Sequence, residues 1–215
     1  MKYRAVIFDL DDTLVKTYRA KWAHHKAVAK KFYGIDLKNE KLRKHWGKPF
    51  DKLIYHLYNN SGTLEEMREV YLSLEQRFPK ELQSNSLNVV NSLLDRGIEV
   101  GVVTSIDSES ANKDLVCLGF PIKRMLVIQG ADITDVHKPD PDVFLPIFKK
   151  LESRGIDKNK IVYVGDALID YEASRDAGID FIAVMTGLDS VVEFRNVGVS
   201  KIIGDIGELL NLILN

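Results

Sequence analysis

The first residues of this chain that could carry chemistry lie in the run FDLDDTL, close to its start. Asp9 ends a short apolar run and Asp11 follows two positions later, a spacing at which an extended chain can direct both carboxylates to one side. Two carboxylates held this close repel each other, so such a pair calls for a cation. Alone, the run is also compatible with an ordinary polar turn after a strand.

Three later segments also place polar groups directly after apolar runs. Thr104 and Ser105 follow EVGVV, Lys138 lies in DVHKPDPDVF, and Asp166 follows IVYVG with Asp170 four residues further on, about one helical turn away. Each segment is a weak signal alone, because Ser, Thr and Asp end many strands. Together with Asp9 they predict one shared site, at the edge where successive parallel strands end.

The charges of these groups predict the kind of chemistry. Four carboxylates would bring up to four negative charges into one crevice, and a phosphate ester would add roughly two more. Mg²⁺, which prefers oxygen ligands, and Lys138 would supply the opposite charge. With this charge balanced, Asp9 could attack phosphorus to form an aspartyl-phosphate, which water then hydrolyses. Asp11 is the candidate acid that protonates the leaving alcohol and the base that then activates water.

The elements that must hold these residues alternate between strands and helices. Short apolar runs predict strands at residues 5–8, 100–103, 126–128, 161–164 and 181–184. Amphipathic stretches such as NVVNSLLDRG and DVFLPIFKKLESRG lie between them and end near a glycine, which is typical of helices. The alternation predicts an α/β fold, with a Rossmann-like parallel sheet and helices on both faces. A weak strand and a helix in KIIGDIGELLNLILN would close it.

One segment interrupts this alternation. From about Val15 to Gln83 the chain shows no strand-like run, only helical patterns such as RAKWAHHKAVAKKFYG. We therefore predict two domains: a core made of residues 1–14 and 84–215, and a small all-α domain at 15–83. A helical insertion directly after the first strand is expected near the carboxyl ends of the strands, where ligands bind in open α/β sheets.

The composition narrows the class of partner. The chain has 30 basic and 31 acidic residues and a formal net charge of -1, without long runs of one sign, so we expect a small molecule and no nucleic acid. We find no signal-like or membrane-spanning segment and expect a cytoplasmic protein, monomeric or homodimeric. The single cysteine, Cys117, excludes a disulfide framework and is expected to be a buried thiol.

These motifs together resemble the haloacid dehalogenase-like (HAD) hydrolase superfamily over essentially the whole chain. FDLDDTLV is similar to its first motif, VVTS to its second, HKPDPDVF to its third and GDALID to its fourth. Asp11 favours phosphoryl chemistry, since the dehalogenases lack that aspartate. Two departures affect only secondary contacts: Ala167 stands where Ser or Thr is frequent, and Ser105-Ile106-Asp107 replaces a more usual polar or basic sequence.

The resemblance implies a role for each matching residue. Asp9 would be nucleophile and metal ligand, and Asp11 the acid/base, which also binds the metal through its backbone carbonyl. Thr104 would bind the phosphoryl group, with Ser105 beside it, and Lys138 would stabilise charge around the nucleophile. Asp166 would bind Mg²⁺ directly, whereas Asp170 would support the metal through water or hold Lys138.

The helical insertion resembles the C1 cap of the phosphoglycolate phosphatase and β-phosphoglucomutase branch, where substrate selection is expected. Its candidate substrate contacts are polar and aromatic side chains: Thr17, Tyr18, Lys21, Trp22, His24, His25, Lys48 and Phe50. Trp22, Trp46 and Tyr71 are more readily explained as packing between helices. His24 and His25 are adjacent and diverge by roughly 100° on a helix, so they do not share one ligand. Lys48, in WGKPF, is a candidate contact to a second anion or a solvated lysine.

The favoured function is thus a Mg²⁺-dependent phosphatase, a HAD-like phosphoric monoester hydrolase acting on a small phosphorylated metabolite. A phosphomutase would use the same Asp9 and Asp11 but would return the phosphoryl group to a sugar phosphate. A receiver-like phosphorylation switch also uses a strand-end Asp, a hydroxyl and a lysine, but such domains have about 120 residues and lack the insertion. The last alternative is a binding protein on a retained hydrolase fold.

Overall fold

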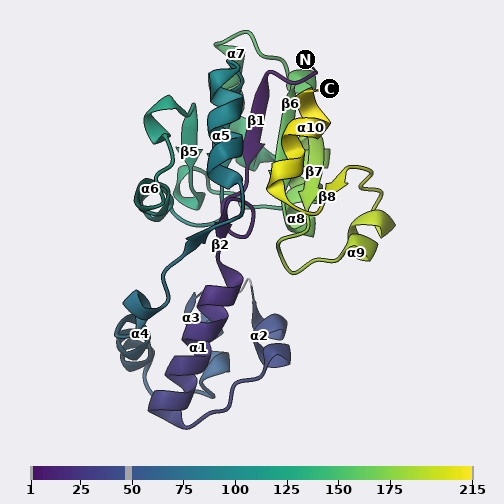
Figure 1. The fold of residues 1–215 in the computed structure, drawn as a ribbon. Coiled ribbons are helices and arrows are strands. Elements are labelled where there is room, and N and C mark those ends of the chain that lie inside the picture. Colours follow the sequence, from purple (N-terminus) through teal and green to yellow (C-terminus); the bar gives the residue numbers. More distant parts are fainter. Residues whose placement is uncertain (1, 47–49, 215) are drawn as a thin grey trace. The chain divides into compact units, whose positions relative to one another are not determined.

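A parallel β-sheet forms the centre of the larger part of the molecule (Figure 1). The computed structural model describes residues 2–46 and 50–214. The sheet has six strands in the order β5-β4-β1-β6-β7-β8, and every neighbouring pair is parallel. The strands are β1 (Ala5–Phe8), β4 (Glu99–Val103), β5 (Val127–Gln129), β6 (Ile161–Gly165), β7 (Asp180–Val184) and β8 (Ile202–Ile203).

Both faces of the sheet are buried, which explains why its strands are continuous apolar runs. Successive side chains of β1 alternate between two cores: Val6 and Phe8 pack into one, and Ala5 and Ile7 into the other. Burying a side chain of the size of Val or Phe stabilises the fold by about 1.5–3 kcal/mol. The central strand is therefore fixed from both sides.

Helices from different parts of the chain cover the two faces. They are α5 (Ser86–Asp95), α6 (Ser108–Cys117), α7 (Leu145–Glu152), α8 (Leu168–Ala177), α9 (Val191–Asn196) and α10 (Leu209–Leu214). The apolar side chains of α5, α6 and α10 share a core with Val6 and Phe8, and those of α7, α8 and α9 share the other. In Figure 1, α5 and α10 lie in front of the sheet and α8 lies behind it.

Short 3-10 helices complete the chain: η1 (Glu75–Arg77), η2 (Ile122–Arg124), η3 (Ala131–Ile133), η4 (Pro141–Phe144), η5 (Lys158–Lys160) and η6 (Ile206–Glu208). The predicted fold class is confirmed, since a strand lies at each of the five predicted positions and at the weak C-terminal one.

Two expectations were wrong. The segment from Val15 to Gln83 contains two short strands, β2 (Val15–Lys16) and β3 (Glu81–Leu82), which pair antiparallel. Two residues are too few to show the alternation by which a strand is recognised in a sequence. Cys117 is exposed and not buried, because it ends α6 beyond the residues that face the core, Ala111 and Leu115.

The chain divides into two compact units, one of residues 1–16 with 81–215 and a helical unit of residues 17–80. The helical unit contains α1 (Tyr18–Tyr33), α2 (Asn39–His45), α3 (Phe50–Leu57) and α4 (Leu64–Leu72). Thr63 begins α4 with a capping box, in which its hydroxyl accepts from the Glu66 amide and Glu66 accepts from the Thr63 amide. Gly34 ends α1 in the left-handed conformation that glycine adopts without strain.

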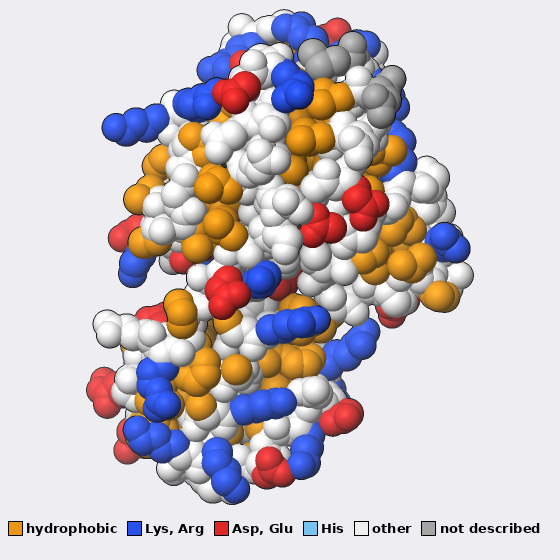
Figure 2. Space-filling view, in the orientation of Figure 1, with side chains coloured by type: hydrophobic (Ala, Val, Ile, Leu, Met, Phe, Trp, Pro, Cys, Tyr) orange, Lys and Arg blue, Asp and Glu red, His pale blue; other side chains and the backbone are white. Residues whose placement is uncertain are grey.

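The two units differ in charge. Residues 17–80 contain 14 Lys and Arg against 7 Asp and Glu, whereas the rest of the chain contains 16 against 24. Figure 2 shows the Lys and Arg side chains of the helical unit spread over its visible face, among hydrophobic and a few acidic side chains. Within the described residues, no helix combines the length and the apolar character needed to cross a membrane.

Candidate active site

Asp9 follows the central strand and is held by the neighbouring one. Its backbone amide donates to the carbonyl of Val164 in β6 at 2.9 Å, which continues the sheet pairing by one residue beyond β1. The chain then turns tightly: Asp12 has a φ of 61°, a left-handed conformation that Asp tolerates better than most residues. The Thr186 hydroxyl donates to the Asp12 carbonyl at 2.5 Å. The loop that carries Asp9 and Asp11 is thus fixed by the sheet and by a later loop.

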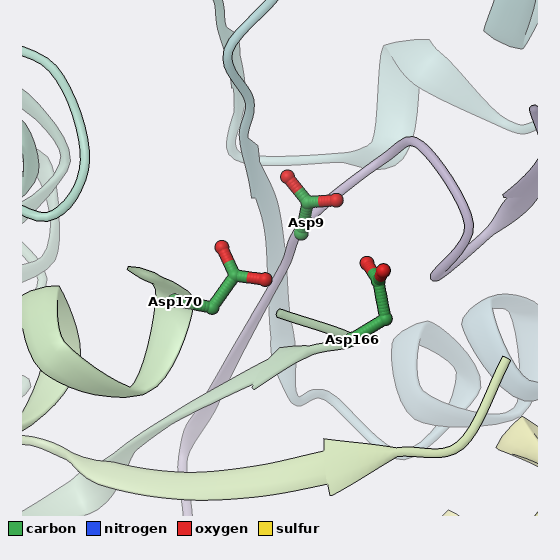
Figure 3. Close-up of side chains that lie close together, drawn as sticks. All are labelled: Asp9, Asp166 and Asp170. Atoms are coloured by element: carbon green, nitrogen blue, oxygen red, sulfur yellow. The ribbon is translucent and has the colours of Figure 1, made fainter. Parts of the chain in front are cut away.

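Three buried carboxyl groups meet at this edge of the sheet (Figure 3). Asp9 lies after β1, Asp166 directly after β6, and Asp170 in the first turn of α8. One oxygen of each lies within 4.8 Å of the others, and the residues are only 6%, 8% and 1% exposed, respectively. The parallel strand ends therefore bring together residues that are about 160 positions apart in the chain.

Lys138 supplies a positive charge to this cluster. Its Nζ atom donates to Asp9 Oδ1 and to Asp170 Oδ1, both at 2.6 Å, and its side chain is 3% exposed. Burial acts to lower the pKa of Lys138, but the carboxylates of Asp170 and Asp9 outweigh it and hold the pKa well above its usual range. Lys138 is thus a fixed ammonium ion between two carboxylates.

One lysine does not balance three buried carboxyl groups. Burial raises the pKa of Asp9 to about 7, against the lowering effect of Lys138, and the charges of Asp170 and Asp11 add to the rise. Burial likewise raises the pKa of Asp166 well above its usual range, and the charge of Asp9 adds to it. A compact set of carboxylate oxygens with excess negative charge fits a hard divalent cation such as Mg²⁺.

Thr13 and Gly187 fix the carboxyl group of Asp166. The Thr13 hydroxyl donates to Asp166 Oδ1 at 3.0 Å, and a Cβ atom at Gly187 would lie 1.9 Å from Asp166 Oδ2. Only a residue without a side chain therefore leaves room for this carboxylate. Neither contact is evident from the sequence, since Thr13 lies in a run that is compatible with a polar turn and Gly187 belongs to no recognised motif.

The start of α8 explains how the chain tolerates Ala167. Ala167 precedes the helix and has no side-chain oxygen to cap it, but two carboxylates accept from other backbone amides at this helix start. Asp170 Oδ2 accepts from the Ala167 amide at 3.1 Å, and Asp189 Oδ2 accepts from the Leu168 amide at 2.7 Å. Asp189, from the loop after β7, thus adds a hydrogen bond to a helix start that Ala167 leaves without a side-chain cap.

Thr104 and Ser105 follow β4 but differ in exposure. Thr104 is buried; its amide donates to the Gln129 carbonyl at 3.0 Å, and its hydroxyl accepts from the Ile106 amide at 3.4 Å. Ser105 is exposed. Asp107, part of the second departure from the motif, caps α6 by accepting from the Ser110 amide at 2.8 Å. The unusual sequence thus begins a helix.

Asp11 is half-buried, and among the described residues the group of mutually close carboxylates contains Asp9, Asp166 and Asp170 but not Asp11. Its charge nonetheless contributes to the raised pKa of Asp9. The predicted contact of Asp11 with the metal uses its backbone carbonyl, and this role and its acid/base role stay predictions.

The candidate substrate contacts of the helical unit lie in varied surroundings. Thr17, Trp22, His24 and His25 are buried, Tyr18 and Lys21 are half-buried, and Phe50 is exposed. Trp22 packs edge-on against Trp46 and Tyr18, and His24 stacks on Tyr71, as expected of helix packing. Lys48 lies outside the described residues.

A family model described as haloacid dehalogenase-like hydrolase matches residues 6–184, a range that includes the carboxyl cluster and Lys138 and ends just before Thr186, Gly187 and Asp189. The chain belongs to the haloacid dehalogenase-like hydrolase family. The predicted resemblance is thereby confirmed.

Relatives within the haloacid dehalogenase-like family have the names of phosphatases. A Clostridium perfringens protein provisionally named pyrophosphatase PpaX is 30% identical over 81% of this chain and 80% of the relative. The N-acetylmuramic acid 6-phosphate phosphatase of Pseudomonas aeruginosa is 28% identical over 87% of this chain and 84% of that enzyme. The predicted enzyme class, a HAD-like phosphoric monoester hydrolase, is confirmed by the family and these names.

Solved structures of the family share the fold over nearly the whole chain. A Thermotoga maritima protein provisionally named a beta-phosphoglucomutase superposes with a TM-score of 0.83 over 98% of both chains, at 22% identity. At this identity the likeness concerns the fold alone.

Proposed function

We propose that this haloacid dehalogenase-like hydrolase is a Mg²⁺-dependent phosphatase that cleaves a small phosphorylated metabolite through an aspartyl-phosphate on Asp9. The observation that carries the proposal is the pairing of Lys138 Nζ with Asp9 Oδ1 at 2.6 Å, inside a buried group of three carboxyls. A lysine placed there holds the carboxyl group of Asp9 in one orientation and reduces its repulsion of an approaching phosphate.

The reaction proceeds in two displacements at phosphorus. A carboxylate oxygen of Asp9 forms a bond to phosphorus as the bond from phosphorus to the ester oxygen breaks, and Asp11 gives its proton to the leaving alcohol. Asp11, now a carboxylate, then removes a proton from the water that attacks the phosphoryl group on Asp9. This second displacement releases inorganic phosphate and restores both aspartates. Thr104, buried at the end of β4, is assigned to the phosphoryl oxygens, with Ser105 beside it.

Asp9 and Asp166 would hold Mg²⁺ through their carboxylates and Asp11 through its backbone carbonyl. Bound there, Mg²⁺ would offset the negative charge of the carboxylates and the phosphate. Asp170 is assigned an indirect role, because its Oδ1 accepts from Lys138 and its Oδ2 from the Ala167 amide. Its carboxylate is thus already engaged by two donors of the chain.

The substrate class follows from charge and from the relatives. By their names, the two relatives act on pyrophosphate and on N-acetylmuramic acid 6-phosphate, both small phosphorylated compounds. The excess of basic residues in the helical unit would attract such anions. We assign this unit, predicted as a cap domain at 15–83, to substrate selection, with Tyr18 and Lys21 as its half-buried candidates.

The test of this function removes the nucleophile with the least change in shape. D9N is expected to lower kcat for p-nitrophenyl phosphate by at least about 10³-fold, because an amide cannot form the acyl phosphate. D135N, at an exposed aspartate of the same unit, is the matched control and should retain wild-type kcat. Circular dichroism checks that both variants are folded. Activity of D9N near the wild-type level would exclude Asp9 as the nucleophile.

The metal is tested separately. Removal of divalent cations with EDTA is expected to abolish turnover, and Mg²⁺ in excess of the chelator should restore it, since the carboxyl cluster needs a cation to accept a dianionic substrate. Turnover that persists in EDTA would exclude the metal but would leave Asp9 as the nucleophile.

A further inference from the structure

Tyr163 lies beneath the carboxyl cluster, in a position that no motif of the sequence includes. It is the third residue of β6, is fully buried, and packs its ring against Phe144 at 4.9 Å between centroids. Its hydroxyl reaches two groups from other strands or loops: Lys138 Nζ at 3.0 Å and the carbonyl of Val103 at 2.8 Å. A buried strand of the sheet thus contributes one polar atom to the site.

The direction of these hydrogen bonds is fixed by chemistry. An ammonium group can only donate and a carbonyl can only accept, so the Tyr163 hydroxyl accepts from Lys138 and donates to Val103. Asp170 Oδ1 lies 3.4 Å from the same hydroxyl and is the poorer acceptor for its one hydrogen. The hydroxyl therefore presents a lone pair to Lys138.

The three hydrogens of Lys138 then have three acceptors. Two are the carboxylate oxygens of Asp9 and Asp170, at 2.6 Å each, and the third is the hydroxyl of Tyr163. Without that hydroxyl, a fully buried ammonium would have one hydrogen without a partner and could rotate between the two carboxylates. The Tyr163 hydroxyl is itself tied to Val103, the residue before Thr104, so it links Lys138 to the end of β4.

We propose that Tyr163 is a positioning residue of the hydrolytic reaction, which fixes the ammonium of Lys138 against the nucleophile Asp9. The proposal rests on the phosphatase function proposed above. Tyr163 acts through Lys138 and has no proposed contact with the substrate, so its hydroxyl should affect turnover and not substrate binding.

The kinetic test removes only the hydroxyl. Y163F is expected to lower kcat for p-nitrophenyl phosphate about tenfold, which corresponds to about 1.4 kcal/mol of transition-state stabilisation, with KM within about twofold of wild type. Y171F is the matched control, because Tyr171 lies in the same unit and its hydroxyl donates to the Val197 carbonyl at an exposed position. An unchanged kcat in Y163F, or an equal loss in Y171F, would overturn the proposal.

A second test needs no substrate. Urea unfolding followed by circular dichroism is compared for wild type, Y163F, K138M and the double variant Y163F/K138M. The loss of the hydroxyl should lower the urea midpoint more when the ammonium is present than in the K138M background, where only the bond to the Val103 carbonyl is lost. Equal shifts in both backgrounds would show that Tyr163 does not act through Lys138 and would refute the assignment.

The two tests separate this proposal from the proposed function. If the wild-type protein hydrolyses no phosphate ester, the phosphatase function fails, whereas the unfolding cycle still decides whether Tyr163 positions Lys138. If Y163F does not fold, the double variant becomes the test, since it lacks the unpaired ammonium. Folding of the double variant would support the pairing, whereas a double variant that fails to fold while K138M folds would contradict it.

Discussion

Acid should destabilise the helical unit through a buried imidazole, that of His25. His25 is 1% exposed, and its Nδ1 atom forms a hydrogen bond with the Tyr58 hydroxyl at 2.8 Å. Burial lowers the pKa of His25 from its ordinary 6.5 to about 3, and the nearby His24 and Lys21 add to the effect. Between these values the unfolded chain binds a proton that the folded chain does not.

The sign and size of the effect follow from this difference. Well above pH 6.5 both states are neutral at His25 and the residue has no effect on the pH dependence. As the pH falls from 6.5 towards 3, the unfolded state gains a proton first, so the free energy of unfolding decreases. At pH 5 the folded imidazole is still neutral, and the loss amounts to about 2 kcal/mol.

The two tryptophans of the chain, Trp22 and Trp46, make this measurable in the intact protein. Both belong to the helical unit, so tryptophan fluorescence in urea follows the unfolding of this unit. H25Q removes the titration and retains a polar partner for Tyr58. Between pH 7.5 and pH 5 the free energy of unfolding of the wild-type protein should decrease by about 2 kcal/mol more than that of H25Q, since all other titratable groups are common to both.

H56Q, at an exposed histidine of the same unit, should retain the full wild-type pH dependence because His25 is still present. The free energy of unfolding of wild type and of H25Q could instead decrease equally between the two pH values. His25 would then accept a proton in the folded chain as readily as in the unfolded chain. The reasoning from burial would then be refuted.

Three further predictions concern the site and its substrate. G187A should lower kcat at least about tenfold and raise the Mg²⁺ concentration needed for activity, because the new Cβ displaces Asp166. G204A, at an exposed glycine, is the control and should change neither quantity. Raising the ionic strength should lower kcat/KM for a dianionic ester several-fold while kcat stays constant. The double variant K30E/K44E should show a weaker salt dependence of kcat/KM. A kcat/KM that does not change with salt would exclude attraction of the substrate by the helical unit. Each sugar phosphate consumed should release one inorganic phosphate, and isomerisation without release would instead indicate the phosphomutase.

The parts of the site that could be predicted from sequence are those fixed by strand ends. Asp9 and Asp166 each follow a buried apolar run, and parallel strands of one sheet end at one edge. Lys138 could be assigned to the site because the carboxylates need a positive charge and because it lies in HKPDPDVF, which resembles the third motif of the family. Its contacts with Asp9 and Asp170 join segments 129 and 32 residues apart, and the sequence alone gives no distance between them.

The contacts that could not be predicted depend on side chains that meet across strands. Tyr163 lies inside an apolar run and reads as a core residue, and its hydroxyl gains a function only because the loop of Lys138 lies above β6. Asp189 has no motif of its own, yet its carboxylate accepts from the Leu168 amide at the start of α8. Such roles follow from three-dimensional proximity, which neither composition nor periodicity encodes.

The register of the sheet links the packing of the core to the chemistry. Phe8 in β1 pairs with Val102 in β4 and with Val164 in β6, so Thr104 and Asp166 both lie one residue beyond the level of Asp9. A slip of β6 by one residue would direct Asp166 to the opposite face of the sheet and would move the Tyr163 hydroxyl away from Lys138. The packing of the two cores, which holds this register, therefore also fixes the distances between nucleophile, lysine and metal-binding carboxylate, although most of the packed side chains have no contact with the site.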